Sequence, residues 1–377
     1  MKRLFYSILK GRNEEWYKKI NGRFKNKIKL IYLDPPYNTK RNRGARKSYN
    51  DKNIDWESTI EQILKQSYDY LRDDGFLAIS INQTELFNLQ RILNNIFNQN
   101  GRCFVGLFPI KIRHKDRQLM IGATFHNVYE YLLIYRKNPK SKFIMSQIDP
   151  KMKDYVYSIK IKENKPKIGK ISGKKIEIYS SNQYEIVKKK PSKNNFRRYL
   201  ISGKIATANW SGEFFEKHLK KFPNQTLIKV YGLENHGKGF RWFETKDTKR
   251  KSGIYFQSFN AGGRPKQVSN DEFDYTDDIT YIYREGGKGI DFKDSKKPEK
   301  MMQRLIEITT KEGDIVFDLF GGSGTTIACC VKKGRSCITI EKEKENVEII
   351  KKRLNNLRDG KDLEKVGHKF KYKCLRI

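Results

Sequence analysis

The sequence predicts an α/β protein in which helices cover a mostly parallel, Rossmann-like sheet and a second, β-rich module is inserted into the chain. Residues 1–138 and 286–377 alternate short apolar strands with amphipathic helices, which is the pattern of a parallel sheet. Residues 139–285 between them are strongly basic and consist of polar β-like pieces such as KKIEIYS. A chain of 377 residues is long enough to bury a core in each of two units.

In the first segment, the elements follow one another in the expected alternation. Strands are predicted at residues 4–9 and 28–33, with a helix at about 14–20 between them. An amphipathic helix within residues 55–75 carries Trp56, Ile60, Ile63, Leu64 and Leu71 on one face. The remaining predicted elements are a strand at 76–81, a helix at 86–97 and strands at 102–110 and 128–135.

The last segment returns to the same alternation. It contains a helix ending at Gly313, a strand at 314–320, the turn GGSG, a helix at about 325–333 and a strand at 336–341. A final helix carries Val347, Ile350, Leu354 and Leu357 on one face. The strand, helix and strand around the glycine turn form a complete βαβ unit.

The net charge of the chain favours a polyanionic partner. The chain has 79 Lys and Arg residues against 43 Asp and Glu, a formal net charge of +36. This balance attracts nucleic acid in particular. A genome rich in A and T would also enrich a protein in Lys, Asn and Ile, so the charge needs support from a motif.

The cysteines and the N-terminus limit the class of protein further. The five cysteines form no CxxC pair and no Cys/His cluster with zinc spacing, so we expect a reduced protein without a metal centre. The basic N-terminus has no long apolar core and no small-residue cleavage site, and no run of roughly 18 apolar residues occurs. We expect a soluble, cytoplasmic protein that does not enter a membrane.

The stretch VFDLFGGSGTT predicts a site for a nucleoside-like cofactor. Gly321, Gly322 and Gly324 let the backbone turn tightly after a strand and approach a ligand at the start of a helix. Glu341 stands at the end of the next strand, where an acid grips ribose hydroxyls in dinucleotide folds. The loop lacks the Lys-Ser/Thr pair of an ATP loop, and Ile327 stands where a dinucleotide fingerprint has its third glycine. A plain tight turn is the alternative when the loop is taken alone.

The stretch LIYLDPPYNTK places a carboxylate at the end of a buried strand. Residues 28–33 are apolar on both faces, as in a central parallel strand, so Asp34 falls at the carboxyl end, where open α/β sheets bind ligands. Pro35 and Pro36 stiffen the turn, and the carbonyl of Pro35 can face outward as a fixed acceptor. Tyr37 adds a flat face. Two acceptors beside a stacking surface suit a planar group that carries an NH2.

Together these residues resemble the DNA amino-methyltransferases that modify adenine N6 or cytosine N4 with S-adenosylmethionine. DPPY with FGGSG looks like their signature pair, and the order of the two motifs resembles the permuted β group. KLIYLDPPYNT, HNVYEYLLIYRKN and KPEKMMQRLIEIT are similar to the Mod subunits of type III restriction-modification systems and their solitary relatives. The resemblance covers roughly residues 1–137 and 290–357. It implies a mostly parallel seven-stranded methyltransferase fold, with residues 139–285 as a target recognition domain.

The resemblance assigns a role to each residue of DPPY. Asp34 and the Pro35 carbonyl would accept hydrogen bonds from the exocyclic amine, Pro36 completes the rigid turn, and Tyr37 would stack on the base. Because the sulfonium of the cofactor is already activated, the protein needs to supply only placement and charge complementarity. A paired base must be flipped out of the helix, which costs a few kcal/mol.

The same resemblance gives the residues that would hold the cofactor. Asn13, in KGRN, resembles the segment that reads the cofactor adenine, and Lys297 the segment beside the methionine carboxylate, although a structural cap explains Lys297 equally well. The complete predicted cofactor set is Asn13, Asp34, Lys297, Asp318, Phe320, Gly322, Gly324, Thr325 and Glu341.

DNA contacts are expected from the loop after Tyr37 and from the inserted module. We hypothesise that the basic loop closes over flipped DNA; a solvated surface loop is the alternative. Basic and aromatic residues alternate in KGFRWF, which suits phosphate contact with base stacking, although a β-domain with a Lys-rich surface has the same texture. The predicted DNA-binding residues are Asn38, Lys40, Arg41, Arg43, Arg46, Lys47 and Arg241.

The leading hypothesis is a sequence-specific DNA adenine-N6 methyltransferase of a restriction-modification or solitary system. Cytosine N4 is the runner-up because the same acceptors serve both amines, and Asp34 favours adenine only by family habit. The hypothesis from another class is a catalytically silent DNA-binding specificity subunit. Cytosine C5 chemistry is disfavoured because no Pro-Cys pair occurs, and RNA is a less favoured substrate than double-stranded DNA. A homodimer and a restriction subunit are the further partners that the resemblance suggests.

Overall fold

A computed structural model of the chain divides into two compact units, one formed by Met1–Met145 with Val268–Ile377 and the other by Ser146–Gln267. The structure describes residues 4–20, 22–37, 56–98, 101–111, 127–148, 150–202, 209–233, 237–246, 253–260, 264–273, 284–290, 296–366 and 368–376. Each unit is described by itself.

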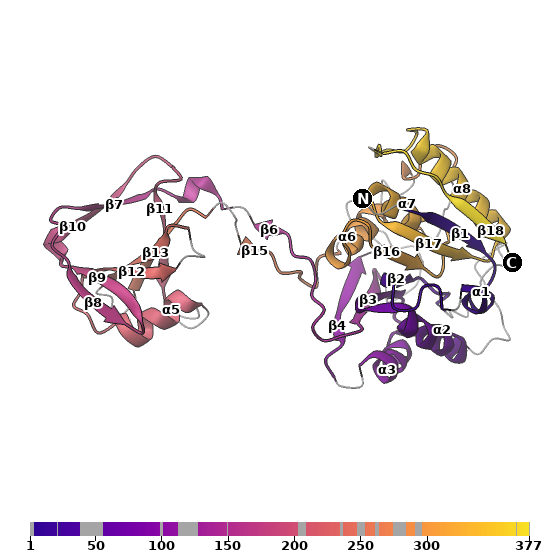
Figure 1. Cartoon of the computed structure of the whole chain (residues 1–377), viewed down its shortest axis with the longest axis horizontal. Coiled ribbons are helices and arrows are strands. Elements are labelled where there is room, and N and C mark those ends of the chain that lie inside the picture. Colours follow the sequence, from indigo (N-terminus) through magenta and orange to yellow (C-terminus); the bar gives the residue numbers. More distant parts are fainter. Residues whose placement is uncertain are drawn as a thin grey trace, which may run out of the picture. The chain divides into compact units, whose positions relative to one another are not determined.

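The first unit is built on an eight-stranded sheet (Figure 1). Its strands are β1 (Tyr6–Lys10), β2 (Ile28–Leu33), β3 (Leu71–Ile81), β4 (Phe104–Lys111), β5 (Tyr129–Arg136), β16 (Ile315–Asp318), β17 (Ser336–Glu341) and β18 (Lys373–Arg376). Their order is β18-β1-β17-β16-β2-β3-β5-β4. The pairs from β18 to β3 are parallel. Strand β5 runs antiparallel to both of its neighbours, β3 and β4. The sheet is therefore mostly parallel, with one strand more than expected, because the C-terminal tail adds β18.

Helices cover both faces of this sheet. The helices are α1 (Asn13–Ile20), α2 (Trp56–Tyr70), α3 (Leu86–Phe97), α6 (Glu299–Thr309), α7 (Thr325–Lys332) and α8 (Lys344–Arg358). One buried core gathers side chains from α1, α2 and α3, and a second gathers side chains from α6, α7 and α8. The sheet is thus wound on both sides, as the alternation of strands and helices predicted.

Strand β2 contributes to both cores. All six of its residues are buried; Leu30 and Tyr32 point into the core with α6 to α8, whereas Ile31 and Leu33 point into the core with α1 to α3. Each such side chain contributes roughly 1.5–3 kcal/mol when it is fully buried. The strand that precedes Asp34 is consequently held from both sides.

The expected helix over residues 55–75 ends earlier than its apolar pattern indicated. Leu71 is the first residue of β3 and pairs with Ile28, while Phe76 pairs with Leu30. The residues between Leu71 and Phe76 form an irregularity in the strand, and a side chain at Gly75 would meet the carbonyl of Arg72 at 2.7 Å. Leu71 is fully buried, but it is buried in the sheet and not on the helix.

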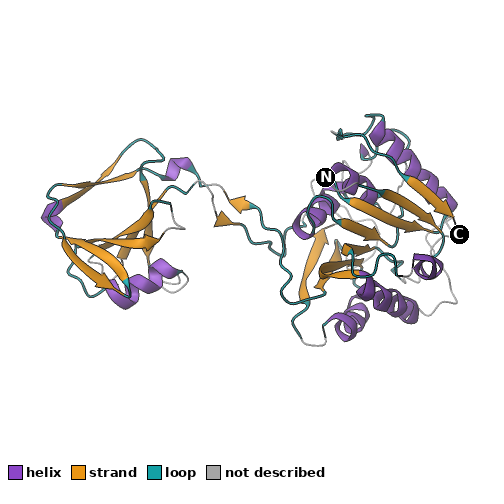
Figure 2. Ribbon diagram, viewed as in Figure 1, coloured by secondary structure: helices purple, strands orange, loops and turns teal. Residues whose placement is uncertain are grey.

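The inserted unit is an antiparallel β-structure (Figure 2). Its main sheet has the order β10-β7-β11-β14-β13-β12-β9-β8. These strands are β7 (Tyr157–Ile161), β8 (Lys167–Ile171), β9 (Lys174–Tyr179), β10 (Tyr184–Lys188), β11 (Phe196–Ile201), β12 (Leu227–Leu233), β13 (Gly239–Thr245) and β14 (Gly253–Ser258). The unit also holds β6 (Gln147–Ile148) paired with β15 (Arg264–Pro265), short 3-10 turns at Met152–Asp154 and Ser181–Gln183, and α5 (Trp210–Phe214), which continues as a π-helical turn at Phe215–Leu219.

The inserted unit begins and ends inside the expected module of residues 139–285. The residues that flank it belong to the first unit: the ring of Phe143 stacks on Phe76 at 5.3 Å between centroids, and Phe273 meets Phe108 edge-on at 5.4 Å. The boundaries at residues 139 and 285 were expected where the charge pattern changes. That pattern does not reveal the ring contacts that Phe143 and Phe273 make.

Among the described residues, no helix has the length and apolar character needed to cross a bilayer. The same part of the chain contains no group of three or more His, Cys, Asp or Glu side chains arranged to hold a metal ion.

Candidate active site

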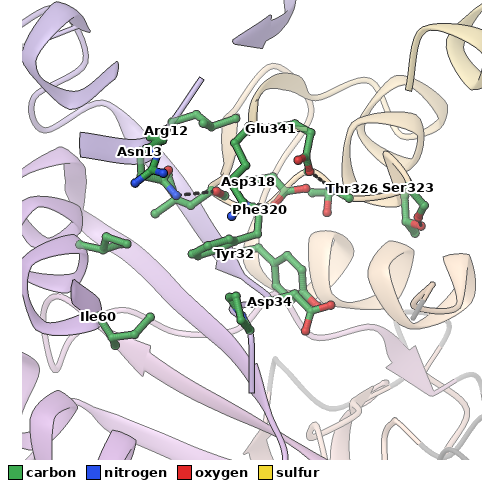
Figure 3. A pocket seen from close by; sticks show the side chains of 18 of the residues that line it. Arg12, Asn13, Tyr32, Asp34, Ile60, Asp318, Phe320, Ser323, Thr326 and Glu341 are labelled. Carbon is green, nitrogen blue, oxygen red and sulfur yellow. Dashed lines mark hydrogen bonds between the residues drawn. The ribbon is translucent and has the colours of Figure 1, made fainter. Parts of the chain in front are cut away.

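A pocket of about 220 Å³ lies at the carboxyl ends of four neighbouring parallel strands, β1, β17, β16 and β2. The segments that follow these strands form its wall: Gly11–Asn13 after β1, Glu341 at the end of β17, the glycine loop after β16, and Asp34 after β2 (Figure 3). This is the edge at which open α/β sheets bind ligands. The two motifs singled out in the sequence therefore face one cavity.

The turn that follows β2 is fixed by an indole. Nε1 of Trp56, the first residue of α2, donates a 2.7 Å hydrogen bond to the carbonyl of Pro36, and the Trp56 side chain also lines the pocket. The hydroxyl of Tyr37 donates to Oδ1 of Asp34 at 2.8 Å. The prolines restrict the backbone and Trp56 anchors its last carbonyl, so Asp34 projects from a rigid turn.

Asp34 belongs to a charged cluster of four residues: Asp34, Tyr37, Glu130 and Lys297. Nζ of Lys297 lies 3.0 Å from Oδ1 of Asp34, 3.0 Å from Oε2 of Glu130 and 2.6 Å from the hydroxyl of Tyr37. The Tyr37 hydroxyl also lies 3.1 Å from Oε2 of Glu130. Lys297, expected beside the cofactor carboxylate or as a cap, lines the pocket and pairs with Asp34.

The electrostatics of the charged cluster hold Lys297 protonated. Burial acts to lower the pKa of Lys297, but attraction by Asp34 and Glu130 outweighs it and raises that pKa above its usual range. Burial raises the pKa of Asp34, opposed by the charge of Lys297 and reinforced by repulsion from Glu130. Glu130, on β5, lies in HNVYEYLLIYRKN, a stretch that resembles the Mod subunits, but the resemblance assigns it no role.

The glycine loop is held against Glu341. The backbone N–H of Gly322 donates to Oε2 of Glu341 at 2.7 Å, and the backbone N–H of Glu343 donates to Oε1 at 2.8 Å. Gly324 caps the N-terminus of α7 with a left-handed φ of 75°, which glycine adopts without strain. A side chain at Gly321 would come within 2.6 Å of Oγ1 of Thr339. Glycine is needed at these positions for close approach and for the turn.

Asp318 ends β16 directly before the loop. Its side chain is 1% exposed, and Oδ1 accepts a 3.1 Å hydrogen bond from the backbone N–H of Phe320. Burial raises the pKa of Asp318 to about 7, and the charges of Asp34 and Glu341 add to the shift. The carboxyl therefore changes its protonation near neutral pH.

Asn13 supplies a free acceptor to the pocket wall. Nδ2 of Asn13 donates to the carbonyl of Leu319 at 2.9 Å, which fixes the orientation of the amide. Its Oδ1 is buried and has no partner within the described part of the chain. An unpaired buried acceptor costs free energy unless a ligand donates to it. The amine of a nucleobase is a donor of the required kind.

The loop rests on a buried ionic network that the sequence did not reveal. Arg353 of α8 is fully buried and donates to the carbonyl of Ser323 and to Oγ1 of Thr325, both at 3.0 Å. Its guanidinium also pairs with Glu299 at 2.5 Å, and Glu299 pairs with Lys332 at 2.6 Å. Thr325, expected among the cofactor residues, thus links the loop to α8. An arginine within an amphipathic helix is ordinarily read as solvated.

The residues predicted to bind DNA are placed differently. Asn38, Lys40, Arg41, Arg43, Arg46 and Lys47 lie outside the described residues. Arg241 is on β13 and is 7% exposed; its guanidinium donates to Ser211 and lies 5.4 Å from the ring of Tyr255. A guanidinium packed inside the unit is not available to a phosphate, so the expected contact of Arg241 finds no support here.

A family model described as "DNA methylase" matches residues 28–352. The chain belongs to this DNA methylase family. The matched range includes the DPPY turn, the charged cluster, the glycine loop and Glu341, so the family assignment and the pocket rest on the same residues. The resemblance found in the sequence to DNA amino-methyltransferases is confirmed.

Two curated DNA methylase relatives match nearly the whole chain. One is the "Probable type III restriction-modification enzyme HindVI Mod subunit" of Haemophilus influenzae, 27% identical over 94% of this chain and 50% of that protein. Another is the EcoPI Mod subunit of Escherichia phage P1, 24% identical over 92% of this chain and 58% of that protein. The chain thus spans between half and three-fifths of their lengths. Among solved structures, the M1.HpyAVI–SAM complex is 17% identical, with a TM-score of 0.44 over 93% of this chain and all of that one.

Proposed function

We propose that the chain transfers a methyl group from S-adenosylmethionine to N6 of adenine in double-stranded DNA. The observation that carries the proposal is the convergence of Asp34, the glycine loop and Glu341 on one pocket at the carboxyl edge of the sheet. An acceptor for an exocyclic amine and a set of groups suited to a nucleoside lie in the same cavity. Such proximity is what a direct transfer between two bound molecules requires.

The pocket has the groups that S-adenosylmethionine needs. Asn13 offers an unpaired Oδ1 to the adenine amine, and the backbone of the loop at Gly322 allows close approach. Each carboxylate oxygen of Glu341 accepts one backbone N–H, and the side chain of Asn346 bonds the same carboxylate. With about four acceptor sites, the carboxylate still has capacity for a ribose hydroxyl. When bound, the cofactor would supply a methyl group made electrophilic by the neighbouring sulfonium.

The amine is received by the other end of the pocket. Asp34 lies on a turn fixed by Pro35, Pro36 and Trp56, so its carboxylate is aimed before the base arrives. In the structure, Oδ1 of Asp34 is bonded by Tyr37 and Lys297, and the incoming amine would replace one of these donors. Release of Tyr37 would leave its ring free to stack on the flipped base.

The choice of adenine rests on Asp34 and on the family resemblance. Cytosine N4 presents the same NH2 to the same acceptors, so the geometry of the pocket serves both amines. We also propose that residues 139–285 recognise the target sequence. Their β-rich fold as an inserted unit supports this proposal, as does the net charge of +36 on the whole chain. A restriction subunit and a second copy of the chain are the partners proposed by analogy with the Mod subunits.

The test combines cofactor binding with transfer. Purified protein is titrated with S-adenosylmethionine by calorimetry, then incubated with labelled cofactor and DNA from a methylation-free host, and the nucleosides are separated. Labelled N6-methyl-2′-deoxyadenosine supports the proposal, and labelled N4-methyl-2′-deoxycytidine would instead identify cytosine N4 as the acceptor. A folded protein that does not bind the cofactor and does not transfer the label would be a silent DNA-binding subunit.

A further inference from the structure

The geometry points to Glu130 as a positioning residue for the proposed methyl transfer: it holds Lys297 and thereby leaves Asp34 with an uncompensated negative charge for the amine. The inference rests on the proposed function and adds a residue to it. Glu130 does not line the pocket and does not touch the reacting atoms; it acts through Lys297.

Three distant chain segments meet at Lys297. Asp34 follows β2, Glu130 lies on β5, and Lys297 directly precedes Pro298, the N-cap of α6. The three hydrogens of the ammonium match three acceptors: Asp34 and Glu130 at 3.0 Å each and Tyr37 at 2.6 Å. The side chains of Lys297, Glu130 and Asp34 are 10%, 18% and 21% exposed. These charges interact in a largely desolvated space, where pairing is stronger than at a surface.

The charge of the cluster follows from its members. Two carboxylates and one ammonium give a net charge of −1. Without Glu130, Asp34 and Lys297 would form a neutral pair, and the amine would have to compete with the ammonium for a carboxylate whose Oδ1 already accepts from Tyr37 and Lys297. With Glu130, Lys297 keeps a partner when Asp34 turns to the amine.

The reaction needs that negative charge. The amine nitrogen forms a bond to the methyl carbon while the carbon–sulfur bond breaks and its electron pair remains on sulfur. The nitrogen then carries a positive charge until it releases one proton to water. A site with a net charge of −1 stabilises the cationic nitrogen, whereas a neutral pair stabilises it much less.

The test uses charge rescue. Glu130→Gln removes the negative charge and keeps the shape, Lys297→Met removes the positive charge, and the double variant restores the net charge of −1. We expect Glu130→Gln to slow single-turnover methyl transfer about 10- to 100-fold, and the double variant to recover about tenfold of that loss. Glu130→Gln alone should change cofactor affinity little, because Glu130 does not line the pocket. Glu272→Gln is the matched control, because Glu272 is 9% exposed and pairs with Arg304 at 2.6 Å outside the pocket.

The pH profile gives a readout that a structural role would not move. Glu130 repels Asp34 and raises its pKa, so Glu130→Gln should shift the acid limb of the transfer rate to lower pH, and Lys297→Met should shift it to higher pH. A carbon-13 titration of Asp34 in the protein without cofactor should show the same directions, independent of turnover.

The outcomes separate the two proposals. Suppose that the wild type methylates DNA, but the rate losses of Glu130→Gln and Lys297→Met simply add in the double variant. If the acid limb and the Asp34 titration also stay in place, the role of Glu130 is overturned and the proposed function stands. A wild type that binds the cofactor and transfers no methyl group would overturn the proposed function, and the role of Glu130 with it.

Discussion

The backbone N–H of Gly322 donates a 2.7 Å hydrogen bond to Oε2 of Glu341. This bond joins the loop after β16 to the end of the neighbouring strand β17. Because Oε1 is fixed by the N–H of Glu343 at 2.8 Å, the carboxylate has one orientation. The loop and the acid are therefore set relative to each other before a ligand binds.

Replacing Glu341 with Gln should weaken cofactor binding. The amide has one acceptor oxygen, so one of the two backbone N–H groups would face an NH2, at a cost of about 1–3 kcal/mol. We expect S-adenosylmethionine affinity measured by calorimetry to fall about 10- to 100-fold. Glu348→Gln, an exposed residue of α8 paired with Lys351, is the control. Equal affinities for wild type and Glu341→Gln would contradict the role given to this carboxylate.

Gly324 should be required both for its left-handed backbone angle and for its close contact with Ile350. Gly324 and Gly173 have φ values of 75° and 76°, but a side chain at Gly324 would meet Ile350 at 3.1 Å whereas Gly173 has open space. Both alanine variants should lose about 1–2 kcal/mol of unfolding free energy through left-handed strain. Gly324→Ala should lose more in urea unfolding and should also bind cofactor more weakly. Equal losses would show that contact with Ile350 is unimportant.

Asp318 should make stability depend on pH near neutrality. Its pKa rises from 3.8 in the unfolded chain to about 7 in the folded one, so the unfolded state loses its proton first as the pH rises. Stability from this group is complete below pH 4, falls between pH 4 and 7, and stays low above pH 7. Asp318→Asn should therefore raise the unfolding free energy at pH 8 by roughly 2–4 kcal/mol and leave it unchanged at pH 4. A gain of the same size at both pH values would contradict this account.

The indole of Trp56 should matter more to transfer than to folding. Trp56→Phe removes the hydrogen bond to Pro36, worth about 0.5–1.5 kcal/mol, and loosens the turn that aims Asp34. We expect a lower single-turnover rate with a modest loss of stability. Trp16→Phe is the matched control, since the buried Nε1 of Trp16 has no partner within the described residues. If Trp56→Phe leaves the transfer rate unchanged, the indole has no role in positioning Asp34 for the reaction.

Much of the fold could be predicted because β2 and its neighbours are marked by strong local signals. A six-residue apolar run, a glycine turn and an acid after the next strand each fix one strand end, and parallel pairing of β17, β16 and β2 brings these ends to one edge. The helix at 86–97 was predicted with the bounds that the structure gives. The weak points were Leu71, whose helical spacing hid an irregular strand, and β18, which is only four residues long.

The interior of the site could not be predicted to the same depth. Glu130, Trp56 and Arg353 reach the site through tertiary packing. The local patterns around them, such as the apolar helix face that includes Trp56, do not reveal these contacts. Lys297 was singled out, but its partner Asp34 is far away in sequence, and only the folded chain shows that the two meet. A buried ion pair depends on how distant segments are placed in three dimensions, and the hydrophobic periodicity of a single sequence does not predict it.

The most direct test of the central claim is to map modified bases in DNA from a methylation-free host that expresses either the wild type or Asp34→Ala. Direct sequencing reports the base, its sequence context and the dependence on Asp34 together. The wild type should produce N6-methyladenine at one recurring sequence, and Asp34→Ala should produce none while remaining folded. Full methylation in the Asp34→Ala strain would contradict the account.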